Sequence, residues 1–202
     1  FDLFQNQVTV YMVPLNGWIN LNSAPEGLIT DALVRWGNMP TNEARSVALW
    51  ILEERKLPEL AGGSRKFHAV DELVRAPGMS YDTFLAIRSL FTVDLQGGGP
   101  VNPAAAPPPV LTVLAGGQGT VAQQILDNRV GQGALTDFTR LQGGNAQVTD
   151  TDMLQIEARI ALSDNTHVLR IWRVALSGEA YGLPWRVLSI EPPVIAKNET
   201  SP

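Results

Sequence analysis

Ile19-Asn-Leu-Asn-Ser-Ala-Pro25, followed by Leu28-Ile29, has a counterpart later in the chain, Val101-Asn-Pro-Ala-Ala-Ala-Pro107, followed by Val110-Leu111. A second pair of segments, Ala48-Leu-Trp-Ile-Leu-Glu-Glu-Arg55 and Ala122-Gln-Gln-Ile-Leu-Asp-Asn-Arg129, aligns without a gap. Similar segments that recur in the same order indicate a repeated structural unit. The sequence therefore predicts two similar units, at about residues 19–96 and 100–147.

Glycine and proline are concentrated between these units. Gly97-Gly-Gly-Pro100 and the prolines at 107–109 are interpreted as the joint between the two copies. The alternative is a low-complexity linker with no structure of its own.

Helix start signals fill the repeated region. Ser23 and Glu26 form a capping-box pair with Pro25 in the first turn, and Thr120 with Gln123 repeats the pattern. The sequence predicts helices that begin near Ser23, Thr41, Asp71, Ser80 and Thr120. The Thr41 helix is expected to end near Arg55-Lys56, and the Ser80 helix to run through Phe91. Gly131 and Gly133 are expected to stop the Thr120 helix.

Strand patterns flank this helical region. Residues 154–162 alternate apolar and polar side chains, which is typical of a strand with one face on a core. Residues 7–13, 168–176 and 185–190 are also predicted strands, with turns at 14–17 and 163–166 and a stop at Pro192-Pro193. We expect the last three strands to form an antiparallel meander that the first strand joins.

These patterns predict an α+β fold, in which a pilin-like antiparallel sheet is interrupted by a large all-helical insertion made of two similar helical units. The expected domains are the first strand at 1–18, the helical insertion at 19–147, and the remaining strands and tail at 148–202.

Composition excludes several classes of function. The 202 residues include 15 Lys and Arg against 20 Asp and Glu, a net charge of −5, which argues against an extensive contact with nucleic acid. Zero cysteines exclude disulfides, thiolate metal sites and a cysteine nucleophile. His68 and His167 are the two imidazoles, far apart in sequence, and no Gly-x-Ser-x-Gly elbow is present. We therefore predict that the protein is not an enzyme, and we assign no catalytic, cofactor-binding or metal-binding residue.

Two glycine motifs have alternative interpretations. Val110–Ala115, followed by Gly117-Gln-Gly119, with Asp137 downstream, matches the letters of a dinucleotide-binding fingerprint but lacks the strand–helix–strand context. The same residues, and Leu73–Met79, resemble helix-hairpin-helix units that bind phosphate, yet no cation occurs between Gly116 and Gln124. A tight helix–helix turn is the favoured interpretation.

The remaining charged residues and the tryptophans give little indication of a functional site. Glu53-Glu54 is interpreted as a solvated helix face, with Arg55 and Lys56 at its C-terminal end, and the five tryptophans as core residues. Asp150, Asp152 and Asp164 could contribute carboxylates to a calcium site, but no loop has dense acidic spacing.

The predicted segments follow one another in a specific order: a strand, Ile-Asn-Leu-Asn-Ser-Ala-Pro, paired helical units with Ala76-Pro-Gly-Met79, a second Val-Asn-Pro-Ala-Ala-Ala-Pro, and a closing sheet. This order resembles that of the general secretion pathway protein K family, the K-type minor pseudopilins of type II secretion. The likeness covers most of residues 7–191 and rests on the Asn-x-Asn-(Thr/Ser)-Ala-Pro signature. It implies a cleaved leader, a hydrophobic N-terminal helix, a pilin-like sheet interrupted by a helical domain, and a place at the tip of the periplasmic pseudopilus with I- and J-type minor pseudopilins.

The sequence departs from the family pattern in two places. No hydrophobic helix precedes Gln7, so the resemblance implies inner-membrane anchoring only through a segment outside this chain. Pro103 and Ala104 replace Leu21 and Asn22, so the second copy is expected to lack some side-chain hydrogen bonds. Some family members bind calcium, but no ligand can be transferred to a matching position here.

The first functional hypothesis is a non-catalytic subunit that caps or initiates the pseudopilus and supports protein export. The rival is a helix-hairpin-helix nucleic-acid-binding module fused to a small sheet, which the negative charge disfavours. An enzyme is the third class.

Overall fold

The computed structural model describes residues 2–3, 6–58, 65–141, 143–162, 166–176 and 184–197. It is an α+β structure with an antiparallel sheet and several helices. The chain divides into two compact units: unit 1 consists of Phe1–Leu15 and Asp150–Pro202, and unit 2 consists of Asn16–Thr149.

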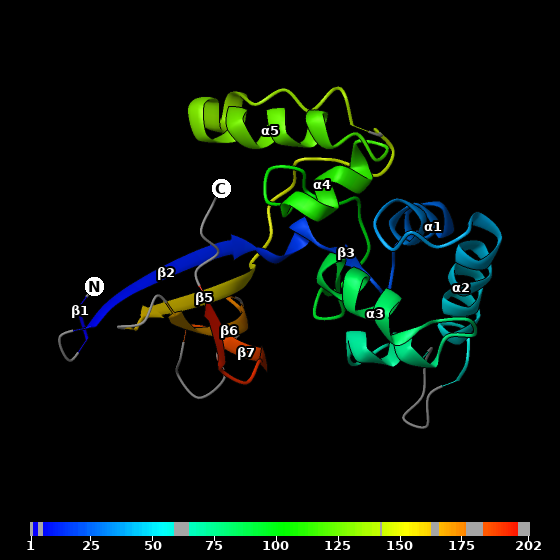
Figure 1. Cartoon of the computed structure of the whole chain (residues 1–202), viewed down its shortest axis with the longest axis horizontal. Coiled ribbons are helices and arrows are strands. Elements are labelled where there is room, and N and C mark those ends of the chain that lie inside the picture. Colours follow the sequence, from blue (N-terminus) through cyan, green and yellow to red (C-terminus); the bar gives the residue numbers. More distant parts are fainter. Residues whose placement is uncertain are drawn as a thin grey trace. The chain divides into compact units, whose positions relative to one another are not determined.

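Unit 1 is built around one antiparallel sheet in which strands from both ends of the chain pair. Its strands are β1 (Asp2–Leu3), β2 (Asn6–Pro14), β5 (Met153–Ala161), β6 (Thr166–Ala175), β7 (Arg186–Ile190) and β8 (Val194–Lys197). The order is β1-β2-β5-β6-β7, and β8 also pairs with β6. Figure 1 shows β2 and β5 side by side, in a register that runs from Val8 opposite Ile160 to Pro14 opposite Leu154. The predicted pairing of the first strand with the closing strands is confirmed.

Two strands of unit 1 are absent from the prediction. β1 is too short to produce an alternating pattern, and β8 resumes the sheet after Pro192-Pro193, where the sequence predicts its end. The two prolines interrupt the backbone hydrogen bonding, but the β-branched Val194 and Ile195 then pair with β6. The predicted turn at 163–166 lies outside the described residues except for Thr166, which begins β6.

The sheet has one strongly apolar face. Residues opposite each other in an antiparallel register share a face. Met12, Ile156 and Trp172 are aligned in this way across β2, β5 and β6, and Ile190 of β7 lies opposite Trp172. On the other face, Tyr11 lies opposite Glu157. The alternation that predicts β5 therefore separates an apolar face from a more polar one.

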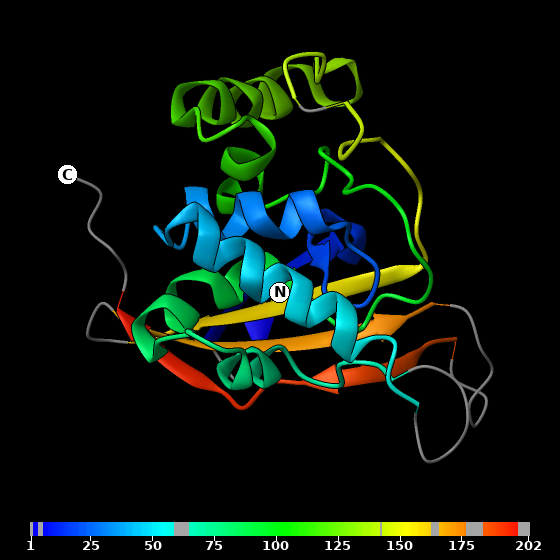
Figure 2. The ribbon, with the colours of Figure 1, turned by 90° about the vertical axis from the view of Figure 1, so that its right-hand side faces the viewer.

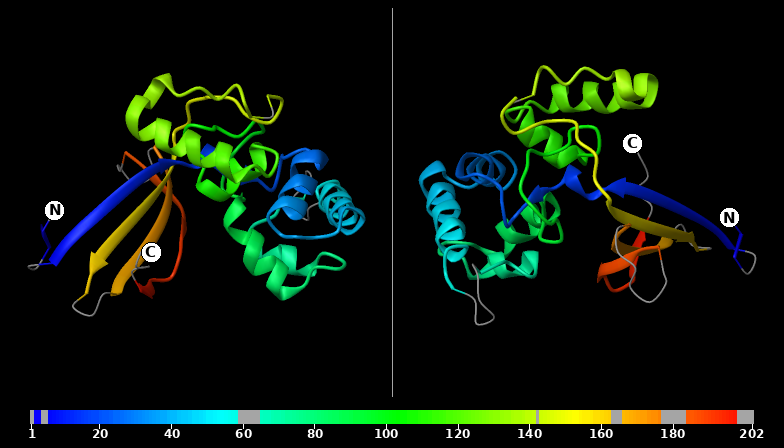
Figure 3. Two further views of the ribbon diagram at one scale, coloured as in Figure 1. Left: turned by 45° about the horizontal axis from the view of Figure 1, so that its top comes forward. Right: turned by 180° about the vertical axis from the view of Figure 1, so that it is seen from behind.

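Unit 2 consists of short helices, four of them arranged as two consecutive pairs. The helices are α1 (Glu26–Arg35), α2 (Thr41–Glu54), α3 (Tyr81–Ile87), α4 (Pro108–Leu114) and α5 (Gly119–Gln132), with 3-10 turns at Val70–Arg75, Arg88–Leu90 and Gly133–Leu135. α1 and α2 pack side by side (Figure 2), as do α4 and α5 (Figure 3). A two-stranded parallel sheet joins β3 (Ile19–Asn20) to β4 (Phe91–Thr92).

The core of unit 2 is formed by the apolar stripes of these helices. Leu28, Ile29 and Leu33 of α1 are buried against Val47 and Ile51 of α2 in one hydrophobic cluster. α4 contributes Val110, Leu111, Val113 and Leu114, which are all fully buried. Because nearly every side chain of α4 is apolar, this short helix is stabilised by burial on several sides rather than by amphipathic packing.

Several predicted helix ends are wrong by a few residues. Pro25, not Ser23, is the N-cap of α1, because the Ser23 N–H already donates to the Asn20 carbonyl in the preceding turn. Thr41 and Thr120 lie inside helices that are capped by Pro40 and Gln118. The Ser80 cap is confirmed, since its hydroxyl accepts the Thr83 N–H.

Other predicted ends also move. Phe91 belongs to β4 rather than to the Ser80 helix, which ends in a 3-10 turn. Gly131 lies inside α5, which ends instead at Gly133, where a φ of +54° favours glycine.

Candidate functional site

The two signature segments, residues 19–25 and 101–107, adopt the same local backbone structure. In the first, the Asn20 carbonyl accepts the N–H groups of Ser23 and Ala24. In the second, the Asn102 carbonyl accepts those of Ala105 and Ala106. Each asparagine Oδ1 also accepts the N–H two residues further on, from Asn22 and from Ala104, at 3.0 Å in both cases. The asparagine thus organises the turn that leads into the following proline-capped helix.

A parallel backbone contact closes each segment on the chain that follows it. Ile19 pairs with Phe91 in the small β3–β4 sheet. Val101, the corresponding residue of the second segment, pairs in parallel with Ala146. Each signature segment therefore contacts the end of its own predicted repeat.

The signature asparagines strengthen the same closure through their side-chain amides. Asn20 Nδ2 donates to the Leu95 and Gly97 carbonyls at 3.3 and 3.0 Å. Asn102 Nδ2 donates to the Thr149 carbonyl at 2.9 Å and to Asn16 Oδ1 at 3.3 Å.

Asn16, Asn102 and Thr149 form a clasp that joins the two ends of unit 2. Asn16 Nδ2 donates directly to the Thr149 carbonyl at 2.9 Å. The Asn102 N–H donates to the Asn16 carbonyl at 2.8 Å. The residues at which unit 2 begins and ends are therefore tied together within unit 2 itself.

One arginine from the second helix of each pair reaches back to its signature segment. Arg55 donates to the carbonyls of Leu21 and Ala24, with its Nε 2.8 Å from the Leu21 oxygen. Arg129 donates to the carbonyls of Pro103 and Ala106, the residues that align with Leu21 and Ala24. Burial lowers the pKa of each arginine to about 10, which leaves both charged at neutral pH.

Arg55 lies at the C-terminal end of α2, as predicted, but its guanidinium does more than complement that helix end. The sequence aligns it with Arg129, but its acceptors are backbone carbonyls about thirty residues away, which no local pattern reveals. Glu54, interpreted as solvated, instead pairs with Arg65 and has only 18% of its side chain exposed. Lys56 does lie on the surface, paired with Glu53.

The copies differ at Asn22, as expected from its replacement by Ala104. Asn22 Oδ1 accepts the Phe67 N–H at 2.7 Å, and its Nδ2 donates to the Phe67 and Val93 carbonyls. An alanine side chain can make none of these bonds. The predicted loss of side-chain hydrogen bonds in the second copy is confirmed.

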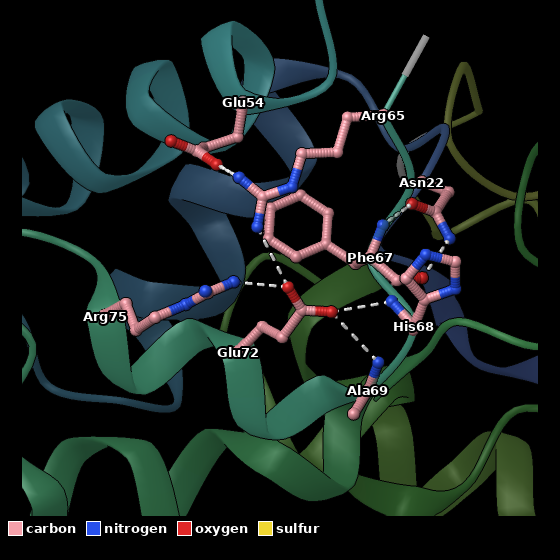
Figure 4. Close-up of polar contacts among 8 residues, drawn as sticks. All are labelled: Asn22, Glu54, Arg65, Phe67, His68, Ala69, Glu72 and Arg75. Atoms are coloured by element: carbon pink, nitrogen blue, oxygen red, sulfur yellow. Dashed lines mark hydrogen bonds and ion pairs between the residues drawn. The ribbon is translucent and has the colours of Figure 1, made fainter. Parts of the chain in front are cut away.

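Glu72 is the centre of a polar network beside the hydrogen bonds between Asn22 and Phe67 (Figure 4). Its carboxylate accepts the His68 N–H at 2.7 Å and the Ala69 N–H at 3.3 Å, and it pairs with Arg65 and Arg75. Partial burial raises the pKa of the Glu72 carboxyl group, but the two backbone hydrogen bonds and the two arginines outweigh this effect and hold the pKa below its usual value. The network fixes the chain that enters the 3-10 turn Val70–Arg75.

The dinucleotide interpretation fails because its glycine motif follows a helix. Val110–Leu114 forms α4, whereas the fingerprint requires a buried strand. Asp137 is exposed, and the hydrogen bonds that its carboxylate accepts from Thr139 lower its pKa. It therefore caps a local turn.

The glycine turn between α4 and α5 uses its N–H groups to end α4. The Gly116 and Gly117 N–H groups donate to the Val113 and Thr112 carbonyls, and both glycines have positive φ. This arrangement is the expected tight helix–helix turn. Sequence reasoning missed a cation beside it: Arg35 of α1 donates to the Gly116 carbonyl and pairs with Asp31.

The two histidines, His68 and His167, lie in structural positions. His68 donates its backbone N–H to Glu72, and His167 lies in β6. Within the described residues, no cluster of three or more His, Asp or Glu side chains is placed to hold a metal ion. Asp150 and Asp152 precede β5, and Asp164 lies outside the described residues.

The apolar face of the unit 1 sheet exposes several large apolar side chains. Met12 is 67% exposed and Ile195 70%, and Val10 and Ile190 are also exposed. Trp172 and Trp185, predicted as core residues, are exposed as well. Exposed apolar side chains that gather on one face are typical of a surface that contacts another protein segment.

Comparison with known proteins identifies the fold. No protein-family model and no curated protein matches the sequence. The structure is similar to that of a chain in the crystal structure of the GspK–GspI–GspJ complex from the type 2 secretion system of enterotoxigenic Escherichia coli, with a TM-score of 0.60 and 14% sequence identity. The match covers 95% of this chain and 81% of that chain. The chain has a pseudopilin-like fold. None of its described helices combines the length and the apolar character needed to cross a membrane.

Proposed function

We propose that the protein is a minor pseudopilin of a type II secretion system, a non-catalytic subunit at the tip of the pseudopilus that caps or initiates the fibre. The observation that carries this proposal is the structural match over almost the whole chain, helical unit 2 included. The exposed apolar face of the sheet supports an assembly role, because such a surface favours contact with other subunits.

The proposed mechanism is steric and interfacial. The sheet of unit 1 contacts neighbouring subunits, while unit 2, the larger share of the chain, is too bulky to be covered by another subunit above it. The clasp of Asn16, Asn102 and Thr149 supports this role, because it closes unit 2 on itself as a body of fixed internal structure.

We further propose that unit 2 contains two copies of one helical unit. The matched turns at Asn20 and Asn102 and the matched arginines, Arg55 and Arg129, support this proposal. Equivalent residues that make equivalent long-range contacts are difficult to explain by a flexible linker.

The partners are proposed to be I- and J-type minor pseudopilins in the periplasm, with anchoring in the inner membrane through an apolar helix encoded upstream. The codons upstream of this sequence test the anchor, since about 20 consecutive apolar residues are needed to span a bilayer.

Size-exclusion chromatography of the protein mixed with the I- and J-type pseudopilins of its own genome tests the assembly role. The expected result is a shared peak that elutes earlier than any single component. Separate elution of all three proteins would refute the proposal. Labelled duplex DNA in a parallel run is expected to show no retention near physiological salt, because the chain is acidic.

A further inference from the structure

Asn16 is the one asparagine of the sequence that is followed by glycine. Asparagine is among the chemically labile residues of proteins, and it is most reactive before glycine, because no Cβ shields the following backbone nitrogen. That nitrogen can attack the side-chain amide of the asparagine. The Asn16-Gly17 pair therefore combines the two features that favour loss of the amide.

The fold requires both residues of this labile pair. A Cβ at position 17 would lie 2.5 Å from the Ala105 carbonyl carbon, so glycine is the residue that fits there. Asn16 uses both ends of its amide: Nδ2 donates to the Thr149 carbonyl and hydroxyl at 2.9 and 3.2 Å, and Oδ1 accepts from Asn102 Nδ2 at 3.3 Å. An ionised aspartate has no hydrogen to donate. Close packing and the clasp together thus place a reactive dipeptide at this position.

The closed clasp holds the pair in an unreactive geometry. Asn16 is the central residue of the 3-10 turn Leu15–Gly17, which restricts its backbone. Three hydrogen bonds hold its side-chain amide against Asn102 and Thr149. Attack by the nitrogen of Gly17, which is buried, requires the Asn16 side chain to turn back toward its own backbone. The reaction therefore requires the clasp to open.

We propose that Asn16 is a self-modification site, protected by the clasp, that is converted to aspartate or isoaspartate in proportion to the time the clasp spends open. The Gly17 nitrogen bonds to the Asn16 Cγ and the Cγ–Nδ2 bond breaks, so that ammonia leaves with the proton released by the Gly17 N–H. Water then adds to either carbonyl of the cyclic imide and opens the ring. No oxidant or reductant takes part. The site is independent of the proposed role in secretion.

The modified clasp cannot close as before. The new carboxylate places an acceptor where Nδ2 donates to the Thr149 carbonyl, so an attractive contact becomes repulsive. Isoaspartate also lengthens the main chain next to Gly17, where the backbone of Ala105 leaves no room. Refolding does not restore the amide. The modification is therefore a permanent loss of the closure between the two ends of unit 2.

A matched pair of asparagine substitutions tests the protection. Asn102 and Asn20 are 5% and 6% exposed and organise equivalent turns, but Asn102 belongs to the clasp and Asn20 does not. Asn102→Ala, Asn20→Ala and the wild type are incubated in mildly alkaline buffer, with and without urea. Mass spectrometry then measures the modified fraction of the peptide that carries Asn16.

The wild type is expected to lose the Asn16 amide at least about tenfold more slowly when folded than in urea, because the reaction requires the clasp to open. Asn102→Ala is expected to speed the reaction of the folded protein at least about fivefold, because Asn16 and Thr149 lose a shared donor. Asn20→Ala is expected to change this rate by less than about twofold. In urea, all three proteins are expected to react at the same rate.

Amide hydrogen exchange measures the consequence of the modification. The Asn102 N–H donates to the Asn16 carbonyl at 2.8 Å, whereas the Ala24 N–H donates to the Asn20 carbonyl in the first copy. Asn16→Asp is expected to speed exchange of the Asn102 amide at least about tenfold, because the clasp opens more often. Exchange of the Ala24 amide is expected to stay within about twofold of the wild type.

Three results would overturn the proposal. Equal rates of modification in folded and urea-unfolded wild type would show that the clasp gives no protection, and this comparison needs no variant. Equal acceleration by Asn102→Ala and Asn20→Ala would show that global unfolding, rather than opening of the clasp, exposes the site. An Asn102 amide that exchanges no faster in Asn16→Asp would show that the modification leaves the clasp closed.

Discussion

Arg55 and Arg129 hold corresponding backbone carbonyls in the two halves of unit 2, although they lie in helices far apart in sequence. Each guanidinium is half-buried and donates to two backbone carbonyls. A lysine can replace the charge but not the planar fork of N–H donors. These arginines are therefore expected to be among the most sensitive polar residues of unit 2.

Substituting either arginine tests this expectation. Arg55→Met and Arg129→Met are each expected to lower the free energy of unfolding by about 2–4 kcal/mol, because buried carbonyls lose their donors. Arg45→Met is the control, because Arg45 is 68% exposed and pairs with Glu26 at the surface. Arg45→Met is expected to lower the free energy of unfolding by less than about 1 kcal/mol. Urea denaturation monitored by circular dichroism gives these values, and equal losses in all three variants would contradict the assigned role.

Glu72 is expected to make the stability of unit 2 depend on pH. Its pKa is lower in the folded chain than its usual value of 4.5, so its ionised form stabilises the fold above that value. The stabilisation is lost as the pH falls from the usual pKa through the lowered one, because the folded carboxylate must then take up a proton.

Glu72→Gln tests the pH dependence directly. At pH 7 the variant is expected to be less stable than the wild type by about 1–2 kcal/mol, since a neutral amide is a weaker acceptor for Arg65 and the backbone N–H groups. The difference is expected to shrink when denaturation is repeated below the wild-type pKa. Glu43→Gln, at an exposed position of α2, serves as the control. A difference that is independent of pH would show that the Glu72 charge is not responsible.

At the scale of elements, Gly17 lies directly against the backbone of the second signature segment. A Cβ at this position would lie 2.5 Å from the backbone carbonyl carbon of Ala105, a distance that requires the backbone to move. Gly27, in α1, has open space around its Cβ position. The two glycines therefore form a matched pair for substitution.

Gly17→Ala is expected to destabilise the chain by about 2 kcal/mol or more through backbone displacement. Gly27→Ala is expected to raise stability by about 0.5–1 kcal/mol, because alanine is the better helix former. Thermal unfolding of both variants measures the difference, and a neutral Gly17→Ala would show that Gly17 is not held against Ala105.

The elements that the sequence predicts correctly are those with long periodic patterns. β5 shows two-residue alternation over its whole length, and α2 shows an apolar stripe, so both were predictable without tertiary information. β3, β4 and β8 have two to four residues each, and pairing partners rather than local pattern determine them.

Helix caps and the polar contacts of unit 2 were less predictable for a physical reason. The capping-box letters at Ser23 are present, but the turn organised by Asn20 uses the Ser23 backbone and moves the cap to Pro25. The repeat alignment pairs Arg55 with Arg129, yet the acceptors of their N–H groups become visible only when distant segments are brought together. Short-range patterns predict elements, while long-range hydrogen bonds determine how these elements end.

At the scale of the whole molecule, unit 2 has the contacts expected of an independently folding body. Its two ends are joined by Asn16, Asn102 and Thr149, and its core cluster is drawn from its own helices. The isolated segment 16–149 is therefore expected to fold with helical circular dichroism and a cooperative thermal transition.

Asn102→Ala in this segment provides a check on the clasp. Asn102 is buried, and its loss is expected to cost about 1–3 kcal/mol because Asn16 and Thr149 lose a shared donor. A segment 16–149 that unfolds without cooperativity would show that unit 2 depends on unit 1 for its structure.

Protein secretion in the cell tests the central claim most directly. The gene that encodes this chain is deleted from its own genome, and export of the type II substrates of that organism is measured by their activity in the culture medium. The account predicts that export falls sharply, that the substrates accumulate in the periplasm, and that the complete gene restores export. Undiminished export from the deletion strain would contradict a role for this protein in type II secretion.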